Sequence, residues 1–194
     1  MLMPNDLQLI KSQTLNHSYL EIKDSLQPAI TPMEFKNGLA AIAYPVAVAV
    51  ACDGEEQNGR TVTSVISLSV NPPRLLISID TTSRMVDLVT TTKKFSVSML
   101  SCGQQNIADA FSGKLDTKNP FGVGRWTKWP SGSLKLAEAT LAMDCELVGS
   151  VDMADHILFV GAVVEAQIDQ MKLPLLWTNR TYAGPTLIQN TYIN

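Results

Sequence analysis

The sequence lacks the short motifs that mark many nucleotide-binding and catalytic sites. It has no G-x-G-x-x-G following a strand, no phosphate-binding loop ending in GKS or GKT, no H-E-x-x-H and no G-x-S-x-G. These absences argue against a Rossmann dinucleotide enzyme, a P-loop nucleotide hydrolase, a zinc metalloprotease and an α/β-hydrolase. A catalytic function must therefore come from a less conspicuous arrangement of residues.

Cysteine and histidine are scarce as well. The three cysteines, Cys52, Cys102 and Cys145, are widely spaced and form no C-x-x-C pair. We therefore expect reduced, mostly buried thiols, with neither a disulfide framework nor a cysteine-rich zinc site. The two histidines, His17 and His156, are too few for a multi-histidine metal centre. The sequence predicts no metal site.

Long hydrophobic runs and an excess of positive charge are also missing. The apolar stretches at 40–52 and 157–164 are interrupted by Pro45 or too short to cross a bilayer, and the N-terminus has no basic and then apolar signal. A net charge of −3 gives no basic field for a nucleic-acid backbone. We expect a soluble, cytoplasmic protein that binds small molecules or proteins, and neither nucleic acid nor a membrane.

The chain does contain enough apolar residues for one substantial core. Of its 194 residues, 45% are hydrophobic and 17% are charged, which favours a single domain with an appendage. Residues 1–29 are polar and rich in Asn, Gln and Ser, so we predict an N-terminal extension there and a domain at 30–194.

Short helices and strands alternate irregularly along the predicted domain. Helix signals occur at Thr31-Pro32-Met33-Glu34, at Ser83, and at Ser101-Cys102-Gly103-Gln104 with Gly113 as a stop. Strand patterns occupy 46–52, 60–70, 75–80, 95–100, 139–149 and 157–168. Because the helices are few and the strands lack regular crossovers, we expect a mainly β protein with short helices, built as a closed antiparallel barrel.

The most unusual segment is hydroxyl-rich, at residues 61–69. Alternation along one continuous strand would place Thr61, Thr63, Ser67 and Ser69 on the same face. Such a row of hydroxyls and strand amides can bind the edge of a planar heterocycle or a phosphate, but threonine also simply favours strands. Composition alone leaves both interpretations open.

Two further segments combine features that suit a phosphate. Ser83-Arg84-Met85 places a hydroxyl and a guanidinium at a helix start, and Phe111-Ser112-Gly113-Lys114 places a cation at a helix end. Backbone amides, hydroxyls and fixed cations are what a phosphate requires. Each segment is equally an ordinary helix cap with a solvated charge.

The order and spacing of these segments resemble the flavin reductase-like, FMN-binding split-barrel family, particularly the reductase components of two-component flavin-dependent monooxygenases. The resemblance spans about residues 35–182. It rests on the segments 59–64, 67–73, 83–85, 108–113, 155–161 and 174–177, followed by Arg180 and Tyr182. One departure is Ala154, where relatives have a glycine before the aspartate and histidine.

The resemblance implies a six-stranded antiparallel Greek-key split barrel that forms a homodimer with flavin near the subunit interface. It also implies an NAD(P)H:flavin oxidoreductase, which transfers a hydride from NADH or NADPH to FMN or FAD and supplies reduced flavin to a partner oxygenase. The alternative is a flavin-storage or electron-transfer protein of the same barrel type without nicotinamide turnover. The sequence does not choose between FMN and FAD, or between NADH and NADPH.

The resemblance also assigns roles to particular residues. His156 is implied as the catalytic residue that orients the nicotinamide. The implied cofactor-binding residues are Thr61, Val62, Thr63 and Ser64 around the isoalloxazine, Ser67, Ser83, Arg84 and Met85 toward the ribityl phosphate, Phe111, Ser112, Gly113 and Lys114 as a cover, and Trp177, Arg180 and Tyr182 as a wall.

Overall fold

A computed structural model of the chain describes residues 25–186. The chain divides into two compact units, Met1–Ile30 and Thr31–Asn194, and every helix and strand that the structure describes belongs to the second. The predicted extension, residues 1–29, and His17 within it therefore lie almost entirely outside the described residues. The domain boundary at residue 30 stays a prediction.

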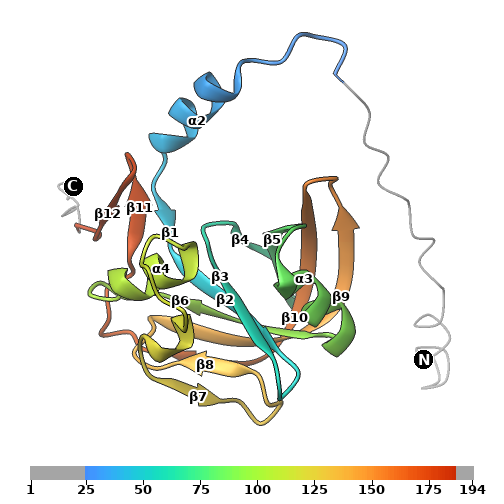
Figure 1. The fold of residues 1–194 in the computed structure, drawn as a ribbon, viewed down its shortest axis with the longest axis vertical. Coiled ribbons are helices and arrows are strands. Elements are labelled where there is room, and N and C mark those ends of the chain that lie inside the picture. Colours follow the sequence, from blue (N-terminus) through green and yellow to red (C-terminus); the bar gives the residue numbers. More distant parts are fainter. Residues whose placement is uncertain (1–24, 187–194) are drawn as a thin grey trace, which may run out of the picture. The chain divides into compact units, whose positions relative to one another are not determined.

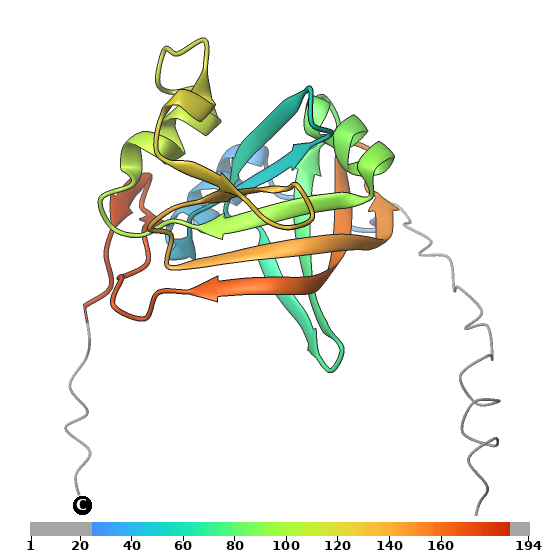
Figure 2. The same ribbon diagram turned by 90° about the horizontal axis from the view of Figure 1, so that it is seen from below.

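The centre of the fold is a seven-stranded antiparallel sheet that curves strongly, as the two views in Figures 1 and 2 show. Its strand order is β3-β2-β6-β9-β10-β5-β4. The strands are β2 (Ala47–Cys52), β3 (Gln57–Val62), β4 (Val65–Val70), β5 (Pro73–Asp80), β6 (Lys94–Met99), β9 (Leu141–Asp152) and β10 (His156–Ile168).

Smaller elements surround this sheet. They are a three-stranded sheet of β1 (Tyr44–Pro45), β11 (Leu176–Thr178) and β12 (Thr181–Ala183), a two-stranded sheet of β7 (Trp126–Lys128) and β8 (Leu134–Leu136), the helices α2 (Pro32–Ala40), α3 (Arg84–Thr92) and α4 (Gln105–Ser112), and the 3-10 turn η2 (Pro120–Gly122). The predicted class, mainly β with short helices, is confirmed. The described sheet has seven strands instead of the six implied, and its hydrogen bonds do not close it into a barrel.

The predicted continuous strand at 60–70 is wrong, because the chain changes partner in its middle. β3 pairs with β2, whereas β4 pairs with β5, and Thr63 and Ser64 connect the two strands. No glycine or proline marks this break in the sequence, so the alternation of the segment conceals it. The two strands are the opposite edges of the large sheet, and their connection becomes part of the site described below.

The starts of α2 and α3 are fixed by local hydrogen bonds. At α2 the Thr31 hydroxyl accepts from the Glu34 N–H at 3.2 Å, and the Glu34 carboxylate accepts from the Thr31 N–H at 2.9 Å, which confirms the capping box. The Ser83 hydroxyl caps α3 as predicted.

The capping box predicted from Ser101 for α4 forms only in part: the Ser101 N–H donates to the Gln104 Oε1 at 2.9 Å, but the Ser101 hydroxyl does not cap the helix. The helix begins after Gln104, which makes no side-chain cap. The Ser101 hydroxyl instead donates to the Glu138 carbonyl at 2.8 Å, a partner 37 residues away that the local sequence does not reveal. Gly113 ends α4 in the left-handed conformation, with φ of 77°, as expected.

The core lies on both faces of β2. The alanines at 47, 49 and 51 pack into one cluster with Phe95, Ile77 and Phe159, and the valines at 46, 48 and 50 pack into a second cluster with Leu100 and Phe111. Burying each large apolar side chain stabilises the fold by roughly 1.5–3 kcal/mol. The second cluster holds α4 against β2, and α4 is one wall of the site.

The three cysteines are free thiols, which agrees with the prediction of no disulfide. Cys145 is buried, and burial raises the pKa of its thiol to about 12. Cys102 is exposed, so the expectation of mostly buried thiols is wrong for that residue. A local chain reversal leaves it at the surface beside the Pro174 carbonyl.

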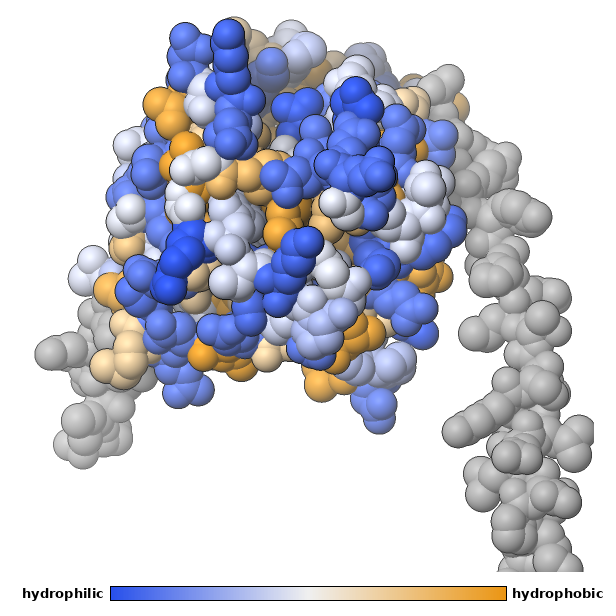
Figure 3. Space-filling view, turned by 60° about the horizontal axis from the view of Figure 1, so that its bottom comes forward, coloured by the Kyte–Doolittle hydropathy of each residue, from blue (hydrophilic) through white to orange (hydrophobic). Residues whose placement is uncertain are grey.

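In the described part of the chain, no helix is long and apolar enough to span a membrane. The face drawn in Figure 3 is largely hydrophilic, and its hydrophobic side chains form separate small areas. Exposed large apolar side chains occur on α2, on β4 and along the later half of β10. They are Met33, Phe35 and Leu39, then Ile66, Leu68 and Val70, then Val164 and Ile168.

Candidate active site

A cavity of about 370 Å³ lies where β3, the connection to β4, β5, α4 and the start of β10 meet. We call it the central cavity. Its lining residues are Arg60, Thr61, Val62, Thr63, Ser64, Ser78, Ile79, Asp80, Phe111, Ser112 and His156. Seven of these lining residues were predicted from the sequence to belong to a site. They come from three segments that are distant in the sequence, and the fold brings them together.

The β3 side of the cavity is an exposed strand edge. Because β3 pairs only with β2 in the described sheet, alternate backbone N–H and C=O groups of β3 point away from β2. The Thr61 hydroxyl donates to the Ala108 carbonyl at 2.7 Å, which ties α4 to this strand. These unpaired strand groups give the cavity hydrogen-bond donors and acceptors in fixed positions.

Phe111 forms a firm aromatic wall against the same strand. Its ring packs edge-on against Phe121 and Trp126, with centroid distances of 4.9 and 5.4 Å. A Cβ atom at Gly59 would lie 2.8 Å from the Phe111 ring, so this close approach requires glycine. Gly59 therefore allows β3 to lie close to α4.

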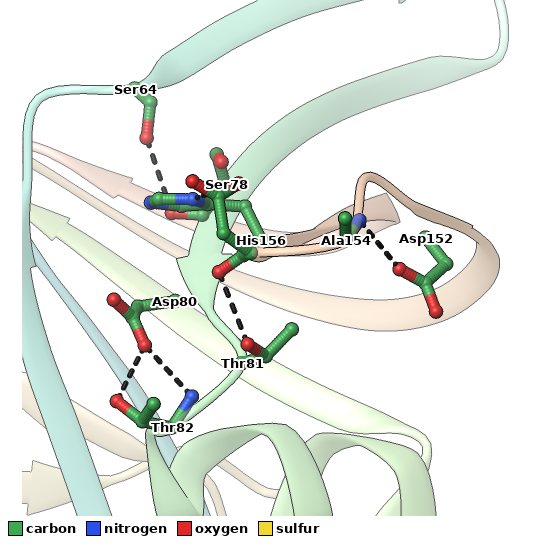
Figure 4. A network of polar contacts seen from close by, with 9 residues as sticks. Ser64, Ser78, Asp80, Thr81, Thr82, Asp152, Ala154 and His156 are labelled. Atoms are coloured by element: carbon green, nitrogen blue, oxygen red, sulfur yellow. Dashed lines mark hydrogen bonds and ion pairs between the residues drawn. The ribbon is translucent and has the colours of Figure 1, made fainter. Parts of the chain in front are cut away.

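His156 stands at the opposite side of the central cavity, as the first residue of β10. It pairs in register with Asp80 of β5, and its Nδ1 lies 3.0 Å from the Asp155 carboxylate. Figure 4 shows this histidine beside Ser78, whose carbonyl accepts from the Ser64 hydroxyl at 3.3 Å. In the described chain the His156 Nε2 has no hydrogen-bond partner, so it is available to a ligand.

Asp80 adds a fixed negative charge near this histidine. Its carboxylate accepts from the Thr82 hydroxyl and backbone N–H, and these bonds hold the pKa of Asp80 below its ordinary value. Asp80 is therefore ionised at neutral pH. Its place in the site was not evident from the sequence, because an aspartate at the end of a strand is also a common turn residue.

Arg60 is the cation that sequence reasoning missed. It lines the central cavity, and its Nε donates to the Ser83 hydroxyl at 3.2 Å. Arg84, predicted to reach a phosphate, instead pairs with Glu56 at 2.8 Å and does not line the cavity. The sequence did contain a signal for this role of Arg60, because Arg60 directly precedes the hydroxyl-rich segment at residues 61–69.

A second cavity of about 190 Å³, which we call the Lys114 cavity, adjoins the first through Thr61, Thr63 and Ser112. The Lys114 ammonium lies 4.1 Å from the centroid of the Trp177 ring, a cation–π contact. The Tyr182 hydroxyl donates to the Asp109 carboxylate at 2.6 Å. Burial and this hydrogen bond raise the pKa of Tyr182, so its hydroxyl stays protonated at neutral pH.

A third cavity of about 670 Å³ lies between α2 and the β11–β12 hairpin, and we call it the rim cavity. It shares Thr63 and Ser64 with the central cavity and Trp177 with the Lys114 cavity. Its remaining lining residues are Met33, Lys36, Leu39, Ala40, Tyr44 and Arg180. The three cavities share lining residues around the end of β3 and its connection to β4.

Four predicted residues lie outside the lining of all three cavities, in addition to Arg84. Ser83 is buried and caps α3, Met85 is fully buried in the core, and Gly113 ends α4. Ser67 lines a separate apolar groove with Val65, Leu75 and Met143. Their predicted roles as direct cofactor contacts remain predictions.

The combined site favours binding and orientation over nucleophilic chemistry. The only side-chain partner of His156 in the described residues is Asp155, so no cavity hydroxyl there is paired with a base. Residues 25–186 also contain no cluster of three or more potential ligands that could hold a metal ion. The site offers strand amides, four cationic side chains and aromatic walls, which suit a planar ligand that carries negative charge.

Comparison with known proteins agrees with this geometry. The chain is 32% identical over 163 residues to the reductase component of an FADH(2)-dependent resorcinol hydroxylase from a Rhizobium species, covering 83% of this chain and 91% of that protein. It is 31% identical to an NADH:riboflavin 5′-phosphate oxidoreductase of Streptomyces pristinaespiralis, covering 84% of this chain and 93% of that protein.

A solved structure has a similar fold. The styrene monooxygenase flavin reductase of Pseudomonas putida S12 superposes with a TM-score of 0.71 at 29% identity, covering 80% of this chain and 99% of that one. The family model described as "Flavin reductase like domain" matches residues 39–186, a range that includes every residue of the central cavity. The chain belongs to the flavin reductase-like family.

Proposed function

We propose that this protein is an NAD(P)H:flavin oxidoreductase that transfers a hydride from nicotinamide to FMN or FAD. The observation that carries the proposal is the central cavity, which places the free edge of β3 opposite His156 with Phe111 as a wall. Two relatives of the chain are named as an NADH:riboflavin 5′-phosphate oxidoreductase and as an NADH-dependent FMN reductase.

The residues present fit a flavin. An isoalloxazine ring needs in-plane donors and acceptors along one edge, which the free amides and carbonyls of β3 supply. The ribityl phosphate needs fixed positive charge, which Arg60 and Lys114 supply from two sides of Thr61 and Thr63. The adjoining cavities leave room for a second ligand beside the flavin.

When bound, the flavin supplies the chemistry of accepting two electrons as a hydride. The chain's own part is to bind and orient. The β3 backbone holds the ring edge, and Arg60 and Lys114 stabilise negative charge on the ligand. The His156 Nε2 hydrogen-bonds to the nicotinamide carboxamide, while Asp155 holds the ring through Nδ1.

The assembly belongs to the same proposal. Val65, Leu75 and Met143 line an apolar groove of about 410 Å³, and exposed Ile66 and Val164 lie on strands that border it. A groove of this kind is unfavourable in water, so a second copy of the chain covers it and buries more than about 1,000 Å². In this proposal the curved sheet of each subunit is a split barrel. The homodimer is cytoplasmic, and it passes reduced flavin to a partner monooxygenase.

The direct test is oxidation of NADH or NADPH by the purified protein with added FMN, FAD or riboflavin, followed by the nicotinamide absorbance. Turnover that requires added or bound flavin supports the reductase. Tight flavin binding without nicotinamide oxidation would favour a storage or electron-transfer protein instead. Light scattering at micromolar concentration tests the dimer, and a monomer would contradict it.

A further inference from the structure

Tyr182 makes a contact that the proposed function does not explain. This tyrosine lies on β12 and packs edge-on against Trp177 of the neighbouring strand β11, with 5.0 Å between the ring centroids. Its hydroxyl donates a hydrogen bond of 2.6 Å to the Asp109 carboxylate on α4, which is 73 residues away in the sequence. The bond joins the β11–β12 hairpin to α4, beside it in Figure 1. A hydrogen bond to a charged acceptor is about twice as strong as one between neutral groups, so it holds both side chains in place.

Asp109 also closes the turn that carries Lys114. Its backbone carbonyl accepts from the N–H groups of Gly113, Lys114 and Leu115 at the end of α4. The bond from the Lys114 N–H measures 3.0 Å, so the two residues are neighbours in space as well as in the sequence. A lysine side chain is long and has many rotamers of similar energy. An ion pair between the Lys114 ammonium and the Asp109 carboxylate is therefore within reach.

This ion pair does not form. Lys114 pairs with no carboxylate of residues 25–186. Its ammonium lies instead 4.1 Å from the centroid of the Trp177 ring and 5.5 Å from that of Tyr182. An aromatic face attracts a cation without neutralising its charge. Lys114 and Tyr182 line the Lys114 cavity, whereas Asp109 does not, so the cavity receives the positive charge without the negative one.

A phenol is well suited to hold this carboxylate. Burial and the hydrogen bond to Asp109 raise the pKa of Tyr182, so the hydroxyl remains a donor at neutral pH. The phenol is also uncharged, so it occupies the carboxylate without adding a charge to the cavity that it lines.

We propose that Tyr182 is a positioning residue that keeps Asp109 from neutralising Lys114. The tyrosine holds the carboxylate, and the unpaired ammonium binds the phosphate of the flavin. The inference rests on the proposed function, which assigns Lys114 to that phosphate, and adds a residue that acts on the phosphate only through its neighbours. Removing the phenol hydroxyl should therefore affect a ligand with a phosphate more than the same ligand without one.

The test compares the dissociation constants of FMN and riboflavin by titration calorimetry, because these ligands differ only in the phosphate. Tyr182→Phe removes the hydroxyl and keeps a ring against Trp177. It frees the Asp109 carboxylate to pair with Lys114, so FMN should lose about fivefold in affinity relative to riboflavin, the size expected for an ion pair near the surface. Asp109→Asn keeps an acceptor for the tyrosine and lacks the charge, so FMN affinity should not fall.

The double variant Tyr182→Phe with Asp109→Asn separates charge from tethering. It lacks the hydrogen bond and also lacks the competing carboxylate, so the ratio of FMN to riboflavin affinity should return to the wild-type value. If the bond were only a tether, the double variant would stay as weak as Tyr182→Phe, and the proposal would be overturned.

Asp116→Asn in the Tyr182→Phe background is the matched control. It removes the same charge from an exposed residue two positions after Lys114 and should not restore FMN binding. Recovery with Asp116→Asn as well would show an effect of net charge alone and would also overturn the proposal.

A crystal structure of Tyr182→Phe tests the inference without ligand or turnover. The Lys114 ammonium should lie within ion-pair distance of the Asp109 carboxylate, and an ammonium that stays over Trp177 with Asp109 unpaired would contradict the proposal. Failure of the proposed function would appear separately, as an absence of NAD(P)H oxidation by the wild type, and would leave this structural comparison interpretable.

Discussion

The substitution His156→Ala separates a ligand-binding histidine from a structural one. The side chain is 43% exposed, and its one side-chain partner in the described chain is Asp155, itself 86% exposed. Such an exposed pair contributes less than about 1 kcal/mol to folding. For a chain of this size that corresponds to a fall in melting temperature of no more than about 4 °C. Binding of flavin should change little.

His156→Ala should therefore lower the rate of NAD(P)H turnover and leave the stability of the fold nearly unchanged. One lost hydrogen bond to the nicotinamide removes about 1.4 kcal/mol of transition-state stabilisation, which lowers kcat/KM for NAD(P)H about tenfold. Steady-state rates, melting temperature and flavin affinity are measured on the same preparations. Asp155→Asn is the matched variant, because it keeps the backbone carbonyl that accepts from Thr81 and changes only the support of the imidazole. An unchanged kcat/KM with a clearly lowered melting temperature would refute the reasoning.

Three further tests address other features of the site and the fold. Arg60→Ala should weaken FMN binding about tenfold more than riboflavin binding, whereas Arg84→Ala, which removes an exposed partner of Glu56, should affect both little; the reverse order would place the phosphate at Arg84. Gly161→Ala should destabilise the fold by about 1–3 kcal/mol in urea denaturation, because its Cβ would lie 2.5 Å from Phe95 Cζ, whereas Gly149→Ala, whose nearest neighbour is 3.8 Å away, is the control and should change stability far less. Ala154→Gly should stabilise by about 0.5–1 kcal/mol, since Ala154 has φ of 70°, and a loss of stability would contradict that assignment.

The Ala154 position also shows what a family resemblance adds to sequence reasoning. Periodicity predicted the strands on either side of this turn, and β9 and β10 are present with ends shifted by a few residues. The turn between them places residue 154 in the left-handed conformation, with φ of 70°, which glycine adopts without strain. Here an alanine occupies the same conformation, and its N–H donates to the Asp152 carboxylate at 2.9 Å. The substitution therefore leaves the turn intact and His156 at the start of β10.

The break between β3 and β4 was harder to predict than the start of α2 for a physical reason. The capping box at Thr31 and Glu34 is complete within four residues, so the local sequence determines it. The break at Thr63 and Ser64 depends on pairing with β2 on one side and β5 on the other, and both partners are distant contacts. Patterns with a period of two cannot indicate where a strand changes its partner.

The same distinction explains which site residues the sequence revealed. Thr61, Phe111 and His156 belong to recognisable segments, and the fold brings those segments to one cavity. Arg60 and Arg84 both adjoin such segments, yet only tertiary structure shows that Arg60 reaches Ser83 while Arg84 turns to Glu56. A charged side chain on a surface strand or helix has many rotamers of similar energy, so its direction is decided by partners far away in the sequence. Binding roles of cations in this fold therefore have to be assigned from contacts, and the Arg60 and Arg84 substitutions measure that assignment directly.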